Sequence, residues 1–446
     1  MKSGPRIVIV GGGSNAWTPN IVKDMLLTPS LTEAEYVLFD INKKPADTNK
    51  AFLEKLCGEL GIKPRITATD SRVKALRGAD YIIITVSTGG LNAMAHDLAI
   101  PEDYGIYHTV GDTTGPGGWA RLMRNFEVFQ SLANDIKRYA PNALVLNYTN
   151  PMVSLTDVMA RILPGRVVGL CHGLFENINF IKEFYKLDSE EEIAVKYAGL
   201  NHFFWITEAK AGGVDVLADL ERRLRRKSLT DLMQMAYKDA MGFQSMNREV
   251  ATELFHLTGV IPYVGDRHTC EYFGRYITSK SVMKTYKIKR TSVAERRTEF
   301  NKRARRLQSM LRGKIDPGYT KRSRETAADI IDAHFQGKVF IDVGNLPNTG
   351  QISNLPHGAV VETAVRVDSN GFSPVGFGAL PPVVQAMCEP WVRAYTMQVD
   401  ACFQGDKQLA MQALLIDPLC AHLTGKQVTE MGNRLLKAHK RFITVF

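Results

Sequence analysis

The stretch Arg6-Ile7-Val8-Ile9-Val10-Gly11-Gly12-Gly13-Ser14 decides the fold of this chain. Its first five residues are mostly β-branched, as expected of a parallel strand that is buried on both faces. Three glycines end the strand, and Thr18-Pro19 then opens a helix, where a proline in the first turn loses no hydrogen bond. A strand, a glycine turn and a helix together predict the first unit of a doubly wound α/β sheet.

The same alternation continues through the first half of the chain. Apolar strand-like runs recur at residues 36–39, 66–69, 81–86 and 143–148. The segments between them place apolar residues three and four apart, which is typical of amphipathic helices. We therefore predict a Rossmann-type domain with a doubly wound parallel sheet over residues 1–196, similar in fold to the lactate and malate dehydrogenases.

The second half of the chain has a different pattern. Long amphipathic helices are joined there by irregular connections rich in Pro and Gly, such as residues 346–356 and 372–382. We predict that residues 197–446 form a mainly helical α+β domain that contributes to catalysis and to oligomerisation.

The glycine turn and the end of the second strand predict a dinucleotide site. Gly11, Gly13 and Ser14 would let the backbone approach a pyrophosphate at the helix N-terminus. Asp40, at the end of the second strand, would bind the ribose hydroxyls and favour NAD over NADP. The turn reads G-G-G-S and not G-x-G-x-x-G, so a simple tight turn is the alternative interpretation.

Charge and cysteine content exclude several classes of protein. The 56 Lys and Arg exceed the 46 Asp and Glu, with clusters at residues 222–227 and 284–306. Both clusters lie in helix-compatible stretches without interleaved aromatic residues, which favours solvated helix faces over a nucleic-acid partner. The six cysteines form no C-x-x-C pair, and the apolar run at 81–86 is too short to span a membrane. We predict a cytoplasmic protein with no membrane partner.

Four polar strings near the predicted domain join carry candidate chemistry: residues 147–151, 171–173, 199–202 and 262–268. Asn150 and Cys171 each follow an apolar strand, at the edge of the sheet where doubly wound folds bind ligands. A cysteine and a histidine brought together there can share a divalent metal. A buried cysteine and a structural histidine are the alternative explanation.

The order and spacing of these strings resemble family 4 of the glycoside hydrolases, whose members depend on NAD and a divalent metal. The resemblance covers almost the whole chain and rests on the following residues: the glycine turn with Thr18-Pro19, Asp40-Ile41-Asn42, Gly115-Pro116-Gly117-Gly118, Asn150-Pro151, Cys171, Asn201-His202 and Gln351-Ile352-Ser353-Asn354-Leu355-Pro356. It implies that Cys171 and His202 bind Mn²⁺, that Asn150 and Asn201 bind substrate, and that the protein is a homodimer or homotetramer.

The residues that follow the metal cysteine sort substrates within the family. Cys171-His172-Gly173 is most similar to the α-galacturonidase branch, whereas Cys-Asp or Cys-Asn resembles the 6-phospho-glycosidases and Cys-His-Ser the neutral α-glucosidases and α-galactosidases. Residues 92–97 also lack the arginine that clamps a sugar phosphate in related enzymes. The resemblance therefore implies a sugar acid or oligogalacturonide as substrate. Arg267, His268 and His108 are candidate partners for its carboxylate, with surface placement open for each.

The family mechanism assigns further roles. It implies oxidation of the sugar at C3 by NAD⁺, removal of the C2 proton, elimination of the aglycone, water addition and return of the hydride, unlike glycosidases with two catalytic carboxylates. Asp266 is the first candidate for the base, Tyr263 the alternative, and His172 a candidate acid. Asp266 pairing with a neighbouring cation, and a structural or metal-orienting His172, stay open.

Other activities are alternatives to α-galacturonide hydrolysis. Within the family they are hydrolysis of α-glucuronides, of 6-phospho-glucosides, or of neutral α-glucosides and α-galactosides. From another class, an NAD-dependent hydroxy-acid dehydrogenase would share the nucleotide half but would need neither Cys171 nor a metal.

Overall fold

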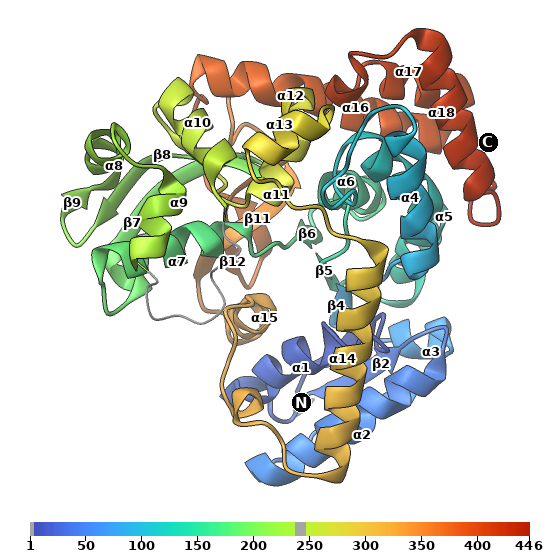
Figure 1. Ribbon diagram of the computed structural model, residues 1–446. Coiled ribbons are helices and arrows are strands. Elements are labelled where there is room, and N and C mark those ends of the chain that lie inside the picture. Colours follow the sequence, from blue (N-terminus) through green and yellow to red (C-terminus); the bar gives the residue numbers. More distant parts are fainter. Residues whose placement is uncertain (1–3, 237–246) are drawn as a thin grey trace.

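The computed structural model describes residues 4–236 and 247–446 (Figure 1). Its first half is a parallel sheet in the order β3-β2-β1-β4-β5-β6. These strands are β1 (Arg6–Val10), β2 (Glu35–Phe39), β3 (Arg65–Thr69), β4 (Tyr81–Ile84), β5 (Leu144–Asn147) and β6 (Val167–Gly169). This strand order is that of dinucleotide-binding Rossmann folds, so the predicted fold class is confirmed.

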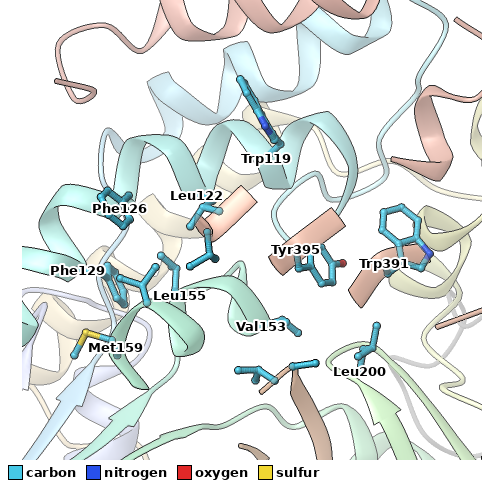
Figure 2. Packing of buried hydrophobic residues seen from close by; sticks show 14 of the residues in the cluster. Trp119, Leu122, Phe126, Phe129, Val153, Leu155, Met159, Leu200, Trp391 and Tyr395 are labelled. Carbon is cyan, nitrogen blue, oxygen red and sulfur yellow. The ribbon is translucent and has the colours of Figure 1, made fainter. Parts of the chain in front are cut away.

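Helices cover both faces of the parallel sheet because side chains of a strand alternate between its faces. In β1, Ile7 and Ile9 belong to the apolar cluster that includes helices α1 (Thr18–Leu26) and α2 (Lys43–Leu60). Val8 and Val10 belong to a second cluster on the opposite face. Figure 2 shows part of this second cluster, in which Trp119 and Phe126 lie with Leu155 and Trp391 from distant parts of the chain. The helices supplying its N-terminal members include α3 (Arg72–Leu76), α5 (Gly115–Tyr139) and α6 (Met152–Ile162).

The second half of the chain extends the same sheet with antiparallel strands. The order continues from β6 through β11 (Phe340–Pro347), β12 (Val360–Asp368), β7 (Ile193–Leu200) and β8 (Phe203–Ala211) to β10 (Ile261–Pro262). β13 (Gly371–Pro374) pairs with β12, and β9 (Val214–Asp215) pairs with β8. The predicted boundary after residue 196 lies inside β7, and one continuous sheet connects the two halves.

Helices surround the antiparallel strands and extend back over the N-terminal half (Figure 1). The remaining helices are α4 (Gly90–Glu102), α7 (Gly173–Tyr185), α8 (Val216–Leu224), α9 (Leu229–Ala236), α10 (Glu249–Thr258), α11 (Asp266–Thr269), α12 (Gly274–Ile277), α13 (Lys280–Thr285), α14 (Val293–Arg312), α15 (Ala327–Gln336), α16 (Pro382–Gln404), α17 (Lys407–Leu415) and α18 (Gly425–Ala438). Within the described ranges, every helix is too short or too polar to cross a lipid bilayer.

Candidate active site

A large cleft of about 1460 Å³ lies where the two halves of the sheet meet. Its wall begins at Ser14, after the glycine turn, and includes residues that follow the carboxyl ends of β4, β5 and β6. Ligands of open α/β sheets bind at this edge. The far side of the cleft is formed by residues of the C-terminal half, so it connects the predicted nucleotide and metal sites.

The glycine turn packs so closely against the protein that side chains would not fit: a Cβ atom on Gly11 would meet Thr85, and one on Gly12 would meet Leu38. Gly11 has a φ of 94°, a left-handed conformation that favours glycine. A Cβ atom on Gly13 would lie 2.8 Å from Oδ2 of Asp40. That same oxygen accepts the N–H of Gly13 at 2.9 Å, while Oδ1 accepts the N–H of Asn42 at 2.9 Å. Asp40 therefore fixes the turn by accepting backbone hydrogen bonds. Its carboxylate oxygens keep further lone pairs for a ribose hydroxyl, so the turn and Asp40 together fit a dinucleotide.

Cys171 and His202 come together in the cleft although 31 residues separate them. Cys171 follows β6, and His202 lies in the turn between β7 and β8; its Nε2 is 3.1 Å from the Cys171 Sγ. His202 has a φ of 60°, which is uncommon outside glycine and costs stability. Such strain clusters at functional sites. Burial raises the pKa of the Cys171 thiol and lowers that of His202.

A chain of hydrogen bonds sets the orientation of His202. The Thr113 hydroxyl donates to Asp112 Oδ1 at 2.9 Å and lies 3.0 Å from His202 Nδ1. A hydroxyl has a single hydrogen, so Thr113 must accept from a protonated Nδ1. The lone pair of the neutral imidazole is then on Nε2, facing Cys171. Burial alone would raise the pKa of Asp112, but Arg121, His268 and His202 together hold it below its usual range.

The donor set fits a divalent metal with open coordination positions. A thiol and an imidazole suit several divalent ions, and hydrogen bonding to the other ring nitrogen is the usual support for a ligating histidine. Among the residues that the structure describes, no group of three or more His, Cys, Asp or Glu is arranged around one point. A cation held by two protein ligands would keep positions for water or substrate oxygens, as catalytic sites do.

The two asparagines predicted to bind substrate differ in position. Asn150 lines the cleft; its carbonyl oxygen accepts from Arg121 Nε at 2.8 Å, and its side-chain oxygen is buried without a partner. Asn201 is fully buried and donates to Glu362 Oε2 at 3.2 Å. Its side chain also hydrogen-bonds Cys171 and lowers the pKa of that thiol, although burial is the larger effect and raises it. Asn201 thus contacts the thiol and is not among the residues that line the cleft.

Tyr263 and Asp266 have very different surroundings. The Tyr263 ring lies in the cleft wall, stacked on His202 with ring centroids 5.9 Å apart, and its hydroxyl bonds Glu176. Asp266 is buried, and its two carboxyl oxygens accept the N–H groups of Val250 and Ala251 at 2.9 and 3.0 Å. Asp266 therefore caps the first turn of α10. The structure brings Tyr263, and not the Asp266 carboxyl, to the cleft.

His172 lines the cleft beside the metal cysteine, and half of its side chain is exposed. Its Nδ1 lies 3.6 Å from Oε1 of Glu325, whose pKa burial raises. A half-exposed histidine in the cleft wall lies in a position that suits a proton donor. Glu325 gave no signal in the sequence, because nothing local relates it to His172.

The structure also distinguishes the three residues that were predicted to bind a substrate carboxylate. His108 is fully buried, with Nδ1 3.1 Å from Glu271 Oε1 and Nε2 accepting the Gly117 N–H. Arg267 and His268 line the cleft, and His268 stacks on His202 at 3.9 Å between centroids. His108 thus supports the fold, whereas the other two can reach a ligand.

Arg248 lies in the cleft wall and was not identified from the sequence. Arg248 is 6% exposed, and its Nη2 lies 3.9 Å from Oε2 of Glu176. Its Nη1 donates to the Asn247 carbonyl at 3.0 Å, whereas its Nε has no partner. A buried cation with incomplete pairing is a candidate anion site. The sequence offered no signal for it, because Arg248 lies outside the four polar strings.

Family models match both halves of the chain. The model described as family 4 glycosyl hydrolase matches residues 6–187, and the model of the family 4 glycosyl hydrolase C-terminal domain matches residues 197–420.

Curated relatives are similar over nearly their full length. An α-galacturonidase of Thermoanaerobacter italicus is 31% identical, with 99% of this chain and 97% of that protein covered. An α-galacturonidase of Bacillus subtilis is 33% identical with 93% of both covered, and an α-galactosidase of the same organism is 30% identical with 97% and 98% covered.

Solved structures share the fold. A crystal structure of the Bacillus subtilis protein lplD, provisionally described as a glucosidase, has a TM-score of 0.85 at 30% identity, covering 97% of this chain and all of that chain. The 6-phospho-β-glucosidase of Thermotoga maritima, solved with manganese, NAD⁺ and glucose-6-phosphate, has a TM-score of 0.80 at 21% identity, covering 98% and 99%. This chain is a member of glycosyl hydrolase family 4.

Proposed function

We propose that this enzyme hydrolyses α-linked galacturonides with the help of NAD and a divalent metal, Mn²⁺ being the first candidate. The observation that carries the proposal is that one cleft is lined both by Ser14, which follows the glycine turn, and by the Cys171–His202 pair. The two α-galacturonidase relatives and the sequence Cys171-His172-Gly173 support a uronic acid substrate. The cleft wall, with eight basic and four acidic side chains, suits an anionic ligand.

Residues on two sides of the cleft would hold the cofactors. Gly11, Gly13, Ser14 and Asp40 would bind the dinucleotide, and Cys171 with His202 would bind the cation. When bound, these groups supply hydride transfer at C3 and stabilisation of negative charge on the C2 and C3 oxygens. The Asp112–Thr113 chain keeps the Nε2 lone pair of His202 available for the cation.

We assign removal of the C2 proton to Tyr263 in preference to Asp266. The Tyr263 hydroxyl is hydrogen-bonded to Glu176. Its oxygen can therefore accept the substrate proton while its own proton moves to Glu176. Burial and Glu176 raise the pKa of Tyr263, which makes a free tyrosinate costly and favours this concerted transfer. Asp266 has both oxygens occupied by backbone N–H groups.

His172 is the residue that would protonate the leaving oxygen. It lies beside Cys171 on the cleft wall, with Oε1 of Glu325 3.6 Å from its Nδ1. Asn150, whose side-chain oxygen has no partner, would accept a hydrogen bond from a sugar hydroxyl.

Arg248 is our first choice for the substrate carboxylate. It is buried in the cleft wall and incompletely paired, so a second carboxylate would find a desolvated guanidinium there. Arg267 is exposed on the same wall and is the alternative, followed by His268.

A substrate panel tests the proposal. α-Galacturonide, α-glucuronide, neutral α-galactoside and 6-phospho-glucoside are each assayed with and without NAD⁺ and Mn²⁺. Cleavage of the α-galacturonide that requires both additions is expected. Cleavage of phosphorylated sugars alone would reject the substrate, and activity that ignores NAD⁺ would reject the mechanism. Net formation of NADH without cleavage would favour a dehydrogenase. The cytoplasmic location and the homodimer or homotetramer stay predictions.

A further inference from the structure

Helix α14 presents one continuous face to the rest of the molecule. Arg296, Phe300, Arg303, Leu307 and Met310 follow one another at intervals of four, three, four and three residues, which places them on the same side of the helix. At the C-terminal end of this face, Leu307 and Met310 are buried in the apolar cluster that contains α2. Helix α14 runs from the C-terminal half down along the nucleotide half (Figure 1).

The N-terminal part of the same face is cationic and lines the cleft. Arg296, Phe300 and Arg303 all belong to the cleft wall, and the Phe300 side chain, 52% exposed, has no apolar cover. The Phe300 carbonyl oxygen accepts from Asn15 Nδ2 at 3.2 Å. Since Asn15 directly follows Ser14, this part of α14 lies over the glycine turn.

The helix is held in place without these two arginines. At its N-terminal side, Thr291 N–H donates to the Thr109 carbonyl at 2.7 Å and Ser292 forms a capping box with Glu295. At its C-terminal side, Lys55 Nζ donates to the Met310 carbonyl at 2.7 Å. Substitution of Arg296 or Arg303 should therefore leave the position of the helix unchanged.

The charge of this face is only partly balanced by the described residues: Arg296 helps to lower the pKa of Asp112, and Glu295 and Glu299 line the same cleft. Residues 14–17 at the glycine turn supply no basic side chain to the cleft, although a dinucleotide pyrophosphate carries two negative charges. Within the described part of the chain, neither Arg296 nor Arg303 forms a salt bridge, whereas Arg306 on another side of α14 pairs with Asp316. The helix face changes from apolar to cationic at the point where it passes from protein core to open cleft.

Building on the proposed NAD site, we propose that α14 closes the nucleotide end of the cleft, with Arg296 and Arg303 binding the pyrophosphate and Phe300 packing between them. The C-terminal half thus adds cations beside the glycine turn, where residues 14–17 supply none. The ligand class is a diphosphate-linked dinucleotide, because Ser14, which follows the glycine turn, and the arginines of α14 line the same cleft.

Isothermal titration calorimetry of the purified full-length enzyme tests this proposal. NAD⁺, ADP-ribose and adenosine are titrated into the wild type, Arg303→Met, Arg296→Met and Arg305→Met. Arg305 is the matched control, since it is an exposed arginine of the same helix that does not line the cleft. Loss of one charge-assisted hydrogen bond should raise the Kd for NAD⁺ and ADP-ribose roughly tenfold or more. The Kd for adenosine, and all values for Arg305→Met, should stay near those of the wild type.

Further results separate this inference from the proposed function. A wild type that fails to bind NAD⁺ would reject both. Binding by the wild type that is equally tight in Arg303→Met and Arg296→Met would reject only the role of α14. A higher KM for oligogalacturonide with unchanged NAD⁺ affinity would also overturn the role, since the arginines would then serve the substrate. Arg303→Lys, which keeps the charge, should retain most of the affinity, and its affinity should fall more in high salt than that of Arg303→Met, which lacks the charge.

Discussion

The glycine turn and the Cys171 pocket lie in the same cleft but are built in different ways. The turn is made of backbone, and the residues that shape it, Gly11 to Gly13 and Asp40, directly follow the first two strands of the sheet. The pocket is made of side chains that come from β6, the β7–β8 turn, the segment before α5 and the segment before α11. The comparison teaches that backbone sites can be recognised from local sequence, whereas side-chain sites depend on how distant segments pack.

The two regions also differ in how they tolerate buried polar groups. The backbone N–H groups of the turn are paired within the protein, those of Gly11 and Gly12 with the Phe39 carbonyl and that of Gly13 with Asp40. The pocket buries Asn201 and its partner Glu362, which need hydrogen-bond partners because an unsatisfied polar group in the interior is costly. Changes in the pocket should therefore affect metal binding, catalysis and pH dependence, while leaving nucleotide affinity nearly intact.

The largest effect is expected from Cys171→Ser. Removing the thiolate ligand should weaken cation binding and lower turnover by roughly a thousandfold or more, since a metal contributes several kcal/mol to stabilising charge. The Kd for NAD⁺ should change less than about twofold. Turnover and calorimetric NAD⁺ affinity are measured in parallel, with Cys57→Ser, a buried cysteine of α2, as the control. Full activity of Cys171→Ser with the metal chelated would contradict the assignment.

The second-largest effect distinguishes Tyr263 from Asp266 as the catalytic base. Tyr263→Phe keeps the ring stacked on His202 but removes the hydroxyl, so kcat for the galacturonide should fall by about 10² to 10⁴. Exchange of the C2 proton with deuterated solvent, followed by NMR, should be lost in the same variant. If Tyr263→Phe exchanges this proton at the wild-type rate, the base lies elsewhere.

A smaller effect is expected when the hydrogen bond between Thr113 and His202 Nδ1 is removed. Thr113→Val removes the acceptor for Nδ1–H, so the imidazole can adopt the other tautomer, and the Kd for Mn²⁺ should rise about 10- to 100-fold. Thr113→Ser, which keeps the hydroxyl, should restore most of the affinity. Electron paramagnetic resonance of free Mn²⁺ measures both. Equal affinity in Thr113→Val and the wild type would show that the hydrogen bond is irrelevant to the cation.

The smallest effect on turnover is expected from Asp266→Asn, below about threefold, because the carboxyl caps α10 and does not face the cleft. Burial raises the pKa of Asp266 to about 7. The folded protein thus retains a proton that the unfolded chain releases near pH 4, and the stabilisation from Asp266 is lost as pH rises from about 4 to 7.

Urea unfolding of both proteins at several pH values measures this linkage. The free energy of unfolding of the wild type should fall relative to Asp266→Asn by up to roughly 4 kcal/mol between pH 4 and pH 8. A kcat lowered more than about a hundredfold in Asp266→Asn would instead make Asp266 the base.

Much of the fold could be predicted from residues that are close in the sequence. The β-branched run at β1, the glycines after it and the spacing of apolar residues in the helices indicate a parallel α/β half, because each of these signals acts over one or two turns of chain. The antiparallel half was less predictable. β7 pairs with β12 through Gly199 and Glu362, and β6 pairs with β11 through Gly169 and Asn345, so no local pattern shows that both halves share one sheet.

By itself, the sequence determined the strand–glycine–helix unit, the acid Asp40 at the end of the second strand and the presence of a cysteine and a histidine in metal-compatible positions. Only the tertiary structure decided which groups meet in the cleft. It joined Thr113 to His202, turned Asp266 to the end of α10 while leaving Tyr263 in the cleft, and laid the cationic face of α14 over the glycine turn. The physical reason is that backbone conformation follows local sterics, whereas the direction, burial and charge environment of a side chain depend on segments that folding brings from elsewhere in the chain.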